Sequence, residues 1–426
     1  MTAPPPTDVH RTIEAVWRIE APKLIASLAR MVRDVGLAEE LAQDALVAAL
    51  EQWPDAGVPD RPGAWLMGTA KHRAIDLLRR SKRLQEKTVL LGREMEIQQE
   101  IGVPDVDAVL DESHISDDLL RLIFTACHPV LSTDARVALT LRMLGGLSTE
   151  EIAHAFLVPE ATIAQRIVRA KRTLTEANVP FEVPFGEELT ERLASVLEVV
   201  YLIFNEGYSA SAGDNWMRPA LCEDALRLGR VLAELVPMEA EVHGLVALME
   251  IQASRTRARI GPSGEPVLLM EQNRGQWDQL LIRRGLTALA RAEALGDALG
   301  PYGLQAAIAA CHARARTPEA TDWERIAALY DGLVQVTPSP VVELNRAVAV
   351  AMAFGPAAGL EIVDELRDEP SLKAYHLLPT VRGDLLVRLG RRDEARQEFE
   401  RAAALAHNAL QKRLLQARAA DCNAAN

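Results

Sequence analysis

Apolar side chains recur at helical spacing along almost the whole chain, and this periodicity restricts the fold more than any other feature. In residues 9–35, for example, Ile13, Trp17 and Leu24 fall on one side of a helix. Runs of β-branched residues are few, and aromatic residues make up only 4% of the 426 residues. The pattern predicts an all-α protein.

The length predicts two to four domains. No uninterrupted apolar stretch approaches the ~20 residues of a membrane helix, and the N-terminus lacks the pattern of a signal peptide. The four cysteines form no C-x-x-C pair, so we expect reduced thiols and no zinc site. These features predict a cytoplasmic protein that does not bind membranes. The cysteines are Cys127, Cys222, Cys311 and Cys422.

The charged residues are strongly segregated, although the net charge of −13 argues against a general nucleic-acid coat protein. Residues 71–87 carry a net charge of +5, residues 92–118 one of −8, and residues 160–173 one of +3. Short basic segments are typical of phosphate binding, and each is alternatively a solvated helix face. The acidic segment between them is predicted to be a linker.

Two further helices are predicted in the N-terminal part, over residues 37–52 and from residue 64 to about residue 87. Proline and glycine make residues 54–63 a loop between them. Trp65 falls at a buried position at the start of the second of these helices, so we expect it in the core. The result is a small helical domain whose last helix is basic on its outer side.

Residues 147–174 predict a helix-turn-helix. Ser148 and Glu151 have the spacing of a capping box, and the turn lies in residues 156–159. Apolar side chains are spaced to pack the two short helices together, although many helical hairpins share this pattern. These apolar residues are Ile152, Ala153, Leu157, Ile163 and Ile167.

From about residue 186 the chain is predicted to stay helical to its end. Gly355 and Gly390 lie 35 residues apart, and each is followed by a similar short helix. This period is close to that of tetratricopeptide repeats, which stack into an α-solenoid. Residues 205–213 are polar and rich in turn-forming residues, which favours an inter-helix loop and leaves a ligand or interface site as the alternative.

Taken together, these segments resemble an extracytoplasmic-function (ECF) sigma factor of the sigma-70 family. "LAEELAQDALVAALEQWP" followed by "RPGAWLMGTAKHRAIDLLRR" is similar to sigma region 2, and "LSTEEIAHAFLVPEATIAQRIVRAKRTL" is similar to sigma region 4. The rest resembles the subgroup with a tetratricopeptide-like extension, through "YLIFNEGYSAS", "GPYGLQAAIAACHA", "TDWERIAALYDGL" and "PSPVVELNRAVAVA". The implied domains are region 2 (8–87), the acidic linker (88–116), region 4 (117–178) and the helical extension (186–426).

The resemblance implies that region 2 binds core RNA polymerase and the minus-ten element of a promoter. Helix 37–52 would dock on the coiled coil of the β′ subunit through Glu39, Glu40, Gln43 and Asp44. The loop and the following helix would hold a melted strand, and residues 56–63 lie where the family captures a flipped base. His72 falls where relatives often place an asparagine. The implied minus-ten residues are Arg61, Lys71, His72, Arg73, Arg79 and Arg80.

Region 4, by the same resemblance, would contact the β flap and place the second helix of its helix-turn-helix in the major groove of the minus-thirty-five element. Gln165 suits adenine and Arg166 suits guanine, while the later cations would hold phosphates. Ala164 stands where many relatives have a basic residue. The implied residues are Thr162, Gln165, Arg166, Arg169, Lys171 and Arg172.

The linker and the extension suggest two further roles. A flexible segment of net charge −8 can lie in a basic polymerase channel as a mimic of nucleic acid, or serve only as a solvated tether. The extension would pack on the sigma domains and regulate them in cis, because an attached partner has a high effective concentration.

Two other classes of protein fit parts of the chain. A one-component helix-turn-helix regulator with a helical sensor domain would explain residues 117–426 but leaves the basic third helix without a role. An enzyme is disfavoured, because the sequence holds no nucleophile–base pair, metal cluster or phosphate-binding loop. No catalytic residue, metal or cofactor is therefore expected.

Overall fold

The computed structural model describes residues 8–91, 112–209, 217–262, 266–406 and 408–424. Within these ranges the chain is built from α-helices and short 3-10 helices, with no sheet strand, which confirms the all-α prediction. None of the helices described there has the length and apolarity needed to cross a bilayer. The chain divides into two compact units, Met1–Val199 and Val200–Asn426.

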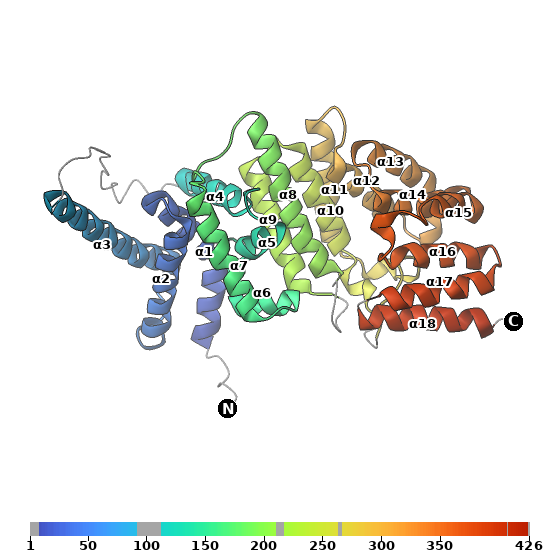
Figure 1. Cartoon of the computed structure of the whole chain (residues 1–426), viewed down its shortest axis with the longest axis horizontal. Coiled ribbons are helices and arrows are strands. Elements are labelled where there is room, and N and C mark those ends of the chain that lie inside the picture. The colour runs from blue at the N-terminus through green and yellow to red at the C-terminus, as the bar shows by residue number, and fades with distance from the viewer. Residues whose placement is uncertain (1–7, 92–111, 210–216, 263–265, 407, 425–426) are drawn as a thin grey trace. The chain divides into compact units, whose positions relative to one another are not determined.

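The first unit contains the two predicted small helical domains (Figure 1). A side-chain oxygen of Asp34 accepts from the amide of Leu37 at 2.8 Å and starts the second helix, and Gly57, with φ of +84°, ends it. The first domain contains α1 (Asp8–Val32), α2 (Val35–Ala56) and α3 (Pro62–Leu91); the second contains α4 (Glu112–Ala126), α5 (Thr133–Met143), α6 (Thr149–Phe156) and α7 (Glu160–Glu176).

The core of the first domain is centred on Trp53, which is 1% exposed. Trp65 is only partly buried and meets Trp53 edge to face, with ring centroids 5.4 Å apart. Further along α3, among the residues up to 80 whose side chains the structure describes, Leu77 is 37% exposed. The basic helix thus has a well-packed start, and its described residues become more exposed toward residue 80.

Helix α8 (Glu187–Tyr208) spans the boundary between the units, and its first turns belong to the first unit. Arg192 donates to the carbonyl of Phe124 at 2.9 Å, and Ser195 donates to the carbonyl of Cys127 at 2.6 Å. These bonds satisfy carbonyl groups at the C-terminal end of α4. The helix runs through residues 205–208 of the predicted loop; residues 210–216 lie outside the described chain.

The second unit is a series of helices in which each packs on its neighbours in the chain (Figure 1). Its apolar core is correspondingly divided into successive clusters, such as one around Leu344 and Phe399 and another around Ala247 and Leu289. This confirms a helical extension. Its α-helices are α9 (Pro219–Leu235), α10 (Ala240–Ala253), α11 (Gln279–Leu295), α12 (Pro301–Arg314), α13 (Trp323–Val336), α14 (Pro340–Phe354), α15 (Pro356–Glu365), α16 (Leu377–Arg388), α17 (Arg392–Leu405) and α18 (Ala409–Ala424).

Gly355 and Gly390, the pair that suggested a repeat, occupy equivalent turns between consecutive helices. Their φ angles are +105° and +77°, which side chains rarely adopt. A Cβ atom at either position would meet nothing within 4 Å. The backbone conformation of the two turns, and not crowding, therefore requires glycine.

Candidate polymerase and DNA interface

The helix-turn-helix lies where the sequence predicted it. Ser148 accepts from the amide of Glu151 at 3.0 Å, and the Glu151 carboxylate accepts from the amide of Ser148 at 2.7 Å, which completes the capping box. Ile152, Ile163 and Ile167 are buried between the helices as expected. Leu157 was predicted to pack with them but is 50% exposed, because it ends α6 in the left-handed conformation with φ of +51°.

Helix α7 exposes a polar and cationic face opposite its buried stripe. Gln165, Arg169 and Arg172 are exposed, and Thr162 is partly buried. Arg166 is turned toward α5, where its guanidinium lies 2.9 Å from the carboxylate of Asp134. This face of α7 therefore presents the amide of Gln165 and the guanidinium groups of Arg169 and Arg172 to solvent.

Helix α3 exposes most of the predicted minus-ten residues. Arg73 lies 3.2 Å from Asp44, so one predicted DNA contact is paired with one predicted polymerase contact. Side chains beyond residue 80 of α3, and most of the acidic segment 92–118, lie outside the described residues. The exposed predicted residues are Arg61, His72, Arg73, Arg79 and Arg80.

Lys71 differs from these residues because it is only 5% exposed. Its Nζ has no hydrogen-bond partner among the described residues. Burial, and secondly the charge of Arg30, lower the pKa of Lys71. In this arrangement the ammonium group is not accessible to DNA.

Helix α2 presents Glu40 and Asp44 to solvent, whereas Glu39 is buried and Gln43 is partly buried. The carboxylate of Glu39 accepts from Arg142 Nε at 2.9 Å and from Lys171 Nζ. Burial would raise the pKa of Glu39, but the two cations outweigh it and hold the pKa below its ordinary value. Glu39, which was predicted to bind polymerase, and Lys171, which was predicted to bind DNA, are thus bound to each other.

Comparison with known families matches the two small domains separately. The family described as Sigma-70 region 2 matches residues 17–84, and the family described as Sigma-70, region 4 matches residues 121–174. Residues 192–293 match a family of unknown function, DUF6596.

Relatives extend the match along the chain. The uncharacterized protein R00370 of Rhizobium meliloti is 44% identical over 388 residues, which cover 91% of this chain and 90% of that protein. The probable ECF RNA polymerase sigma factor SigI of Mycobacterium tuberculosis is 25% identical over 40% of this chain and 57% of its own length. The RNA polymerase sigma-H factor of Pseudomonas aeruginosa is 26% identical over 37% of this chain and 81% of its own length.

The chain belongs to the ECF sigma factors of the sigma-70 family. It is an RNA polymerase sigma factor with a C-terminal helical extension, and its partners are core polymerase and promoter DNA. We refer to helices α1, α2 and α3 as region 2, and to helices α4 to α7 as region 4. The predicted boundaries of these domains and the predicted contact residues stay predictions.

The structure shows two residues of this sigma factor at or near the predicted contact surfaces that the sequence analysis did not identify. Val168, which the sequence analysis did not single out, is 64% exposed and lies between Gln165 and Arg172 on the outer face of α7. Its offset by one residue from the buried Ile167 was the available signal. Arg142 carried no local signal, because its partner Glu39 lies 103 residues away.

The described residues hold no group of three or more histidine, cysteine, aspartate or glutamate side chains that could bind a metal ion. The four cysteines are free and buried. Burial raises the pKa of Cys127 to about 11 and that of Cys222 to about 12, so neither is a thiolate near neutral pH.

Proposed function

We propose that the factor directs core polymerase to promoters by reading a minus-thirty-five element with α7 and a minus-ten element with α3 and the loop before it. The observation that carries this proposal is the exposed face of α7. A helix-turn-helix places its second helix in the major groove, where the Gln165 amide pairs well with adenine. Arg169 and Arg172 lie on the same exposed face and would contact phosphates.

The exposed cations of α3 support its proposed role at the minus-ten element. Arg79 and Arg80 lie on the outer half of the helix, and Arg61 and His72 flank its well-packed start. Cations along such a surface suit the backbone of a melted strand. Lys71 would have to leave its buried position to join them.

The outer face of α2 supports the proposed docking on the β′ coiled coil, with region 4 on the β flap. Glu40 and Asp44 are exposed, and Val47 is 50% exposed beside them. A mixed acidic and apolar surface of this kind fits a basic partner. A factor of this function would work in the cytoplasm.

Run-off transcription with core polymerase from the source bacterium tests the proposal. Full-length factor should produce transcripts from specific start sites on linear DNA, and polymerase should be recovered with it in a pull-down. A helix-turn-helix regulator without sigma activity would bind DNA but start no transcript, and that result would refute the proposal.

Val168 should read a thymine methyl group in the minus-thirty-five element, because its exposed branched side chain lies beside Gln165 on the proposed groove face. Val168→Ser removes the apolar contact from a position that contributes little to the fold. We expect about a three- to tenfold loss of preference for thymine at one base pair, measured by selection of bound sequences with the holoenzyme. An unchanged set of selected sequences would contradict this role.

We also propose that the extension regulates the sigma domains in cis. Its covalent attachment supports this, because even a weak contact is populated at high effective concentration. The truncated protein should keep residues 1–199 and should not stop at residue 186, because Arg192 and Ser195 donate hydrogen bonds to carbonyl groups at the end of α4. Truncation should change transcript yield by at least about threefold; an unchanged yield would refute regulation in cis.

A further inference from the structure

Arginine and aromatic side chains of the second unit stack against one another where α8 ends. The Cζ atom of Arg259 lies 3.5 Å from the ring centroid of Tyr208, and that of Arg255 lies 5.8 Å from the same centroid. Arg255 also lies 5.8 Å from the ring centroid of Trp277, and Arg274 lies 5.1 Å from it. We call Tyr208, Arg255, Arg259, Arg274 and Trp277 the arginine–aromatic cluster. Several positive charges are thus held close together.

Within this cluster, Arg255 and Arg274 bond only to neutral acceptors of the described chain. Arg255 is partly buried and donates to the Tyr208 hydroxyl at 2.6 Å. Arg274 is buried and donates to two backbone carbonyls and to the Thr321 hydroxyl. Neither guanidinium forms an ion pair with a carboxylate of the described residues. Their charges are therefore solvated by dipoles and not neutralised.

Arginines that are equally buried elsewhere in the described chain are paired with carboxylates. Arg192 lies 3.0 Å from Glu188. Arg382 lies 2.8 Å from Asp364 and 2.9 Å from Glu398. Buried charges are costly unless they are paired and hydrogen-bonded. The arginine–aromatic cluster departs from this pattern and offers positive charge to an anionic ligand.

The charges of the cluster act together on the imidazole of His312. Burial, and then the charges of Arg255 and Arg274, lower the pKa of His312 to about 4. The charge of Glu319 also reaches Arg274, but Glu319 is exposed, and burial lowers the pKa of Arg274 in spite of it. His312 is therefore neutral near pH 7, and the guanidinium groups supply the charge of this region.

Two N–H groups of the cluster are buried without a hydrogen-bond partner in the described chain. They are Nε of Arg274 and Nε1 of Trp277, and the two residues are 9% and 3% exposed. Buried donors in folded proteins are normally satisfied. Charged oxygens are the strongest acceptors for such groups. Unpaired donors beside unneutralised guanidinium groups together favour an oxyanion as the ligand.

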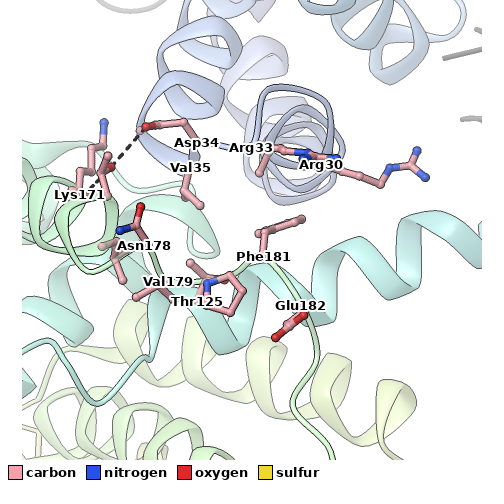
Figure 2. Close-up of a pocket in the computed structure, with 15 residues that line it drawn as sticks. Arg30, Arg33, Asp34, Val35, Thr125, Lys171, Asn178, Val179, Phe181 and Glu182 are labelled. Atoms are coloured by element: carbon pink, nitrogen blue, oxygen red, sulfur yellow. Dashed lines mark hydrogen bonds between the residues drawn. The ribbon is translucent and has the colours of Figure 1, made fainter. Parts of the chain in front are cut away.

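The cavity of about 580 Å³ in the first unit differs from the cluster, because acids and cations both line it (Figure 2). Two of its cations, Arg30 and Lys171, are already paired with the carboxylates of Asp118 and Glu39. Its charge therefore gives no preference for an anion. The lining cations are Arg30, Arg33 and Lys171, and the lining acids are Asp34 and Glu182.

We propose that the arginine–aromatic cluster binds a small organic anion through its carboxylate or phosphate group. Guanidinium groups pair with either group through two parallel hydrogen bonds. Arg255 is partly exposed, whereas Arg274 and Trp277 are buried, so a small ligand reaches donors that the flat surface of a macromolecule does not. The inference does not depend on the proposed function, because binding is a property of the second unit alone.

Such a site would lie on the helix that joins the extension to region 4. Tyr208 is the last residue of α8, and the first turns of the same helix bond to the end of α4 through Arg192 and Ser195. An anion bound at the cluster thereby contacts the connection through which the proposed regulation in cis would pass.

Calorimetric titration of the full-length protein with inorganic phosphate tests the proposal, with the ionic strength kept constant by sodium chloride. We expect one saturable site with a dissociation constant of about 1 mM or lower. Arg255→Met removes the guanidinium donors from a side chain of similar shape, and it should weaken phosphate binding at least about tenfold. Arg283→Met is the matched control, since Arg283 is exposed on α11, and should leave the affinity unchanged.

Malonate and a tetraglutamate peptide identify the class of ligand. Tighter binding of malonate than of phosphate would assign a carboxylate, and the reverse order a phosphate; either order supports the proposal. Tighter binding of the peptide than of both small anions, lost in Arg255→Met, would assign an acidic segment of a partner protein and overturn the proposal.

Arg255→Lys is a second variant that keeps the positive charge. One ammonium group cannot donate two parallel hydrogen bonds, so this variant should weaken phosphate binding at least about threefold. Hydrogen exchange of the wild-type protein needs no substitution: phosphate should slow exchange in peptides within 254–262 and 266–278, and not in peptides of α16 to α18. Equal phosphate affinities of wild type, Arg255→Met and Arg255→Lys would overturn the proposal, as would protection confined to other peptides or the absence of saturable binding of both phosphate and malonate.

Discussion

Replacing Gln165 by alanine is expected to weaken the affinity of the holoenzyme for its preferred promoter about 10- to 100-fold, through one or two adjacent base pairs of the minus-thirty-five element. Gln165 is exposed near the start of α7, so the change leaves the core intact. A bidentate amide contact with adenine contributes about 1–3 kcal/mol of discrimination. Competition binding with promoters altered at single base pairs would measure it.

Arg172→Ala is the matched comparison on the same face of the helix. Arg172 is exposed, and its own ion pair with Glu176 spans 3.3 Å at the surface. Loss of a phosphate contact should weaken binding to all sequences equally and reduce the salt dependence by about one charge. If Gln165→Ala also lost affinity equally on every sequence, Gln165 would hold the backbone and would not read a base.

The features that the sequence predicted well are those encoded over a few residues. The capping box from Ser148 to Glu151 spans four residues, and the buried stripe of α7 repeats every three or four. Gly355 and Gly390 marked their turns for the same local reason. Helix positions and the helix-turn-helix could therefore be predicted before any tertiary contact was known.

The features that could not be predicted from the sequence depend on contacts with residues far away in the chain. Glu39 reads as a surface acid on an amphipathic helix, but Arg142 and Lys171 lie 103 and 132 residues further on and bury it. Lys71 was predicted to contact DNA because it belongs to a basic segment. Such a segment does not show which of its side chains the fold buries. Leu157 shows the reverse case, an apolar residue left exposed by the conformation that ends its helix.

Arg274→Ala is expected to lower the free energy of unfolding of the second unit by about 3–5 kcal/mol. Arg274 is 9% exposed and donates to the carbonyls of His312 and Ala315, at 2.8 and 2.7 Å, and to the Thr321 hydroxyl at 3.0 Å. One guanidinium thus fixes the segment that joins α12 to α13. Alanine leaves the His312 carbonyl and the Thr321 hydroxyl buried without this donor, deprives the partly buried Ala315 carbonyl of it, and removes the guanidinium from the face of Trp277.

Hydrogen exchange in urea, followed separately for peptides of each unit, would measure the loss. Peptides of α11 to α13 should exchange faster in Arg274→Ala, whereas peptides of α1 to α7 should not change, because Arg274 makes its contacts inside the second unit. Arg283→Ala is the control, since this arginine is exposed and its guanidinium donates to the carbonyl of Gln279 in its own helix. Lysine at position 274 should restore little of the stability, because one ammonium group cannot reproduce the spread of donors that reaches all three acceptors. Equal exchange in Arg274→Ala and Arg283→Ala would show that helix packing alone holds the extension together.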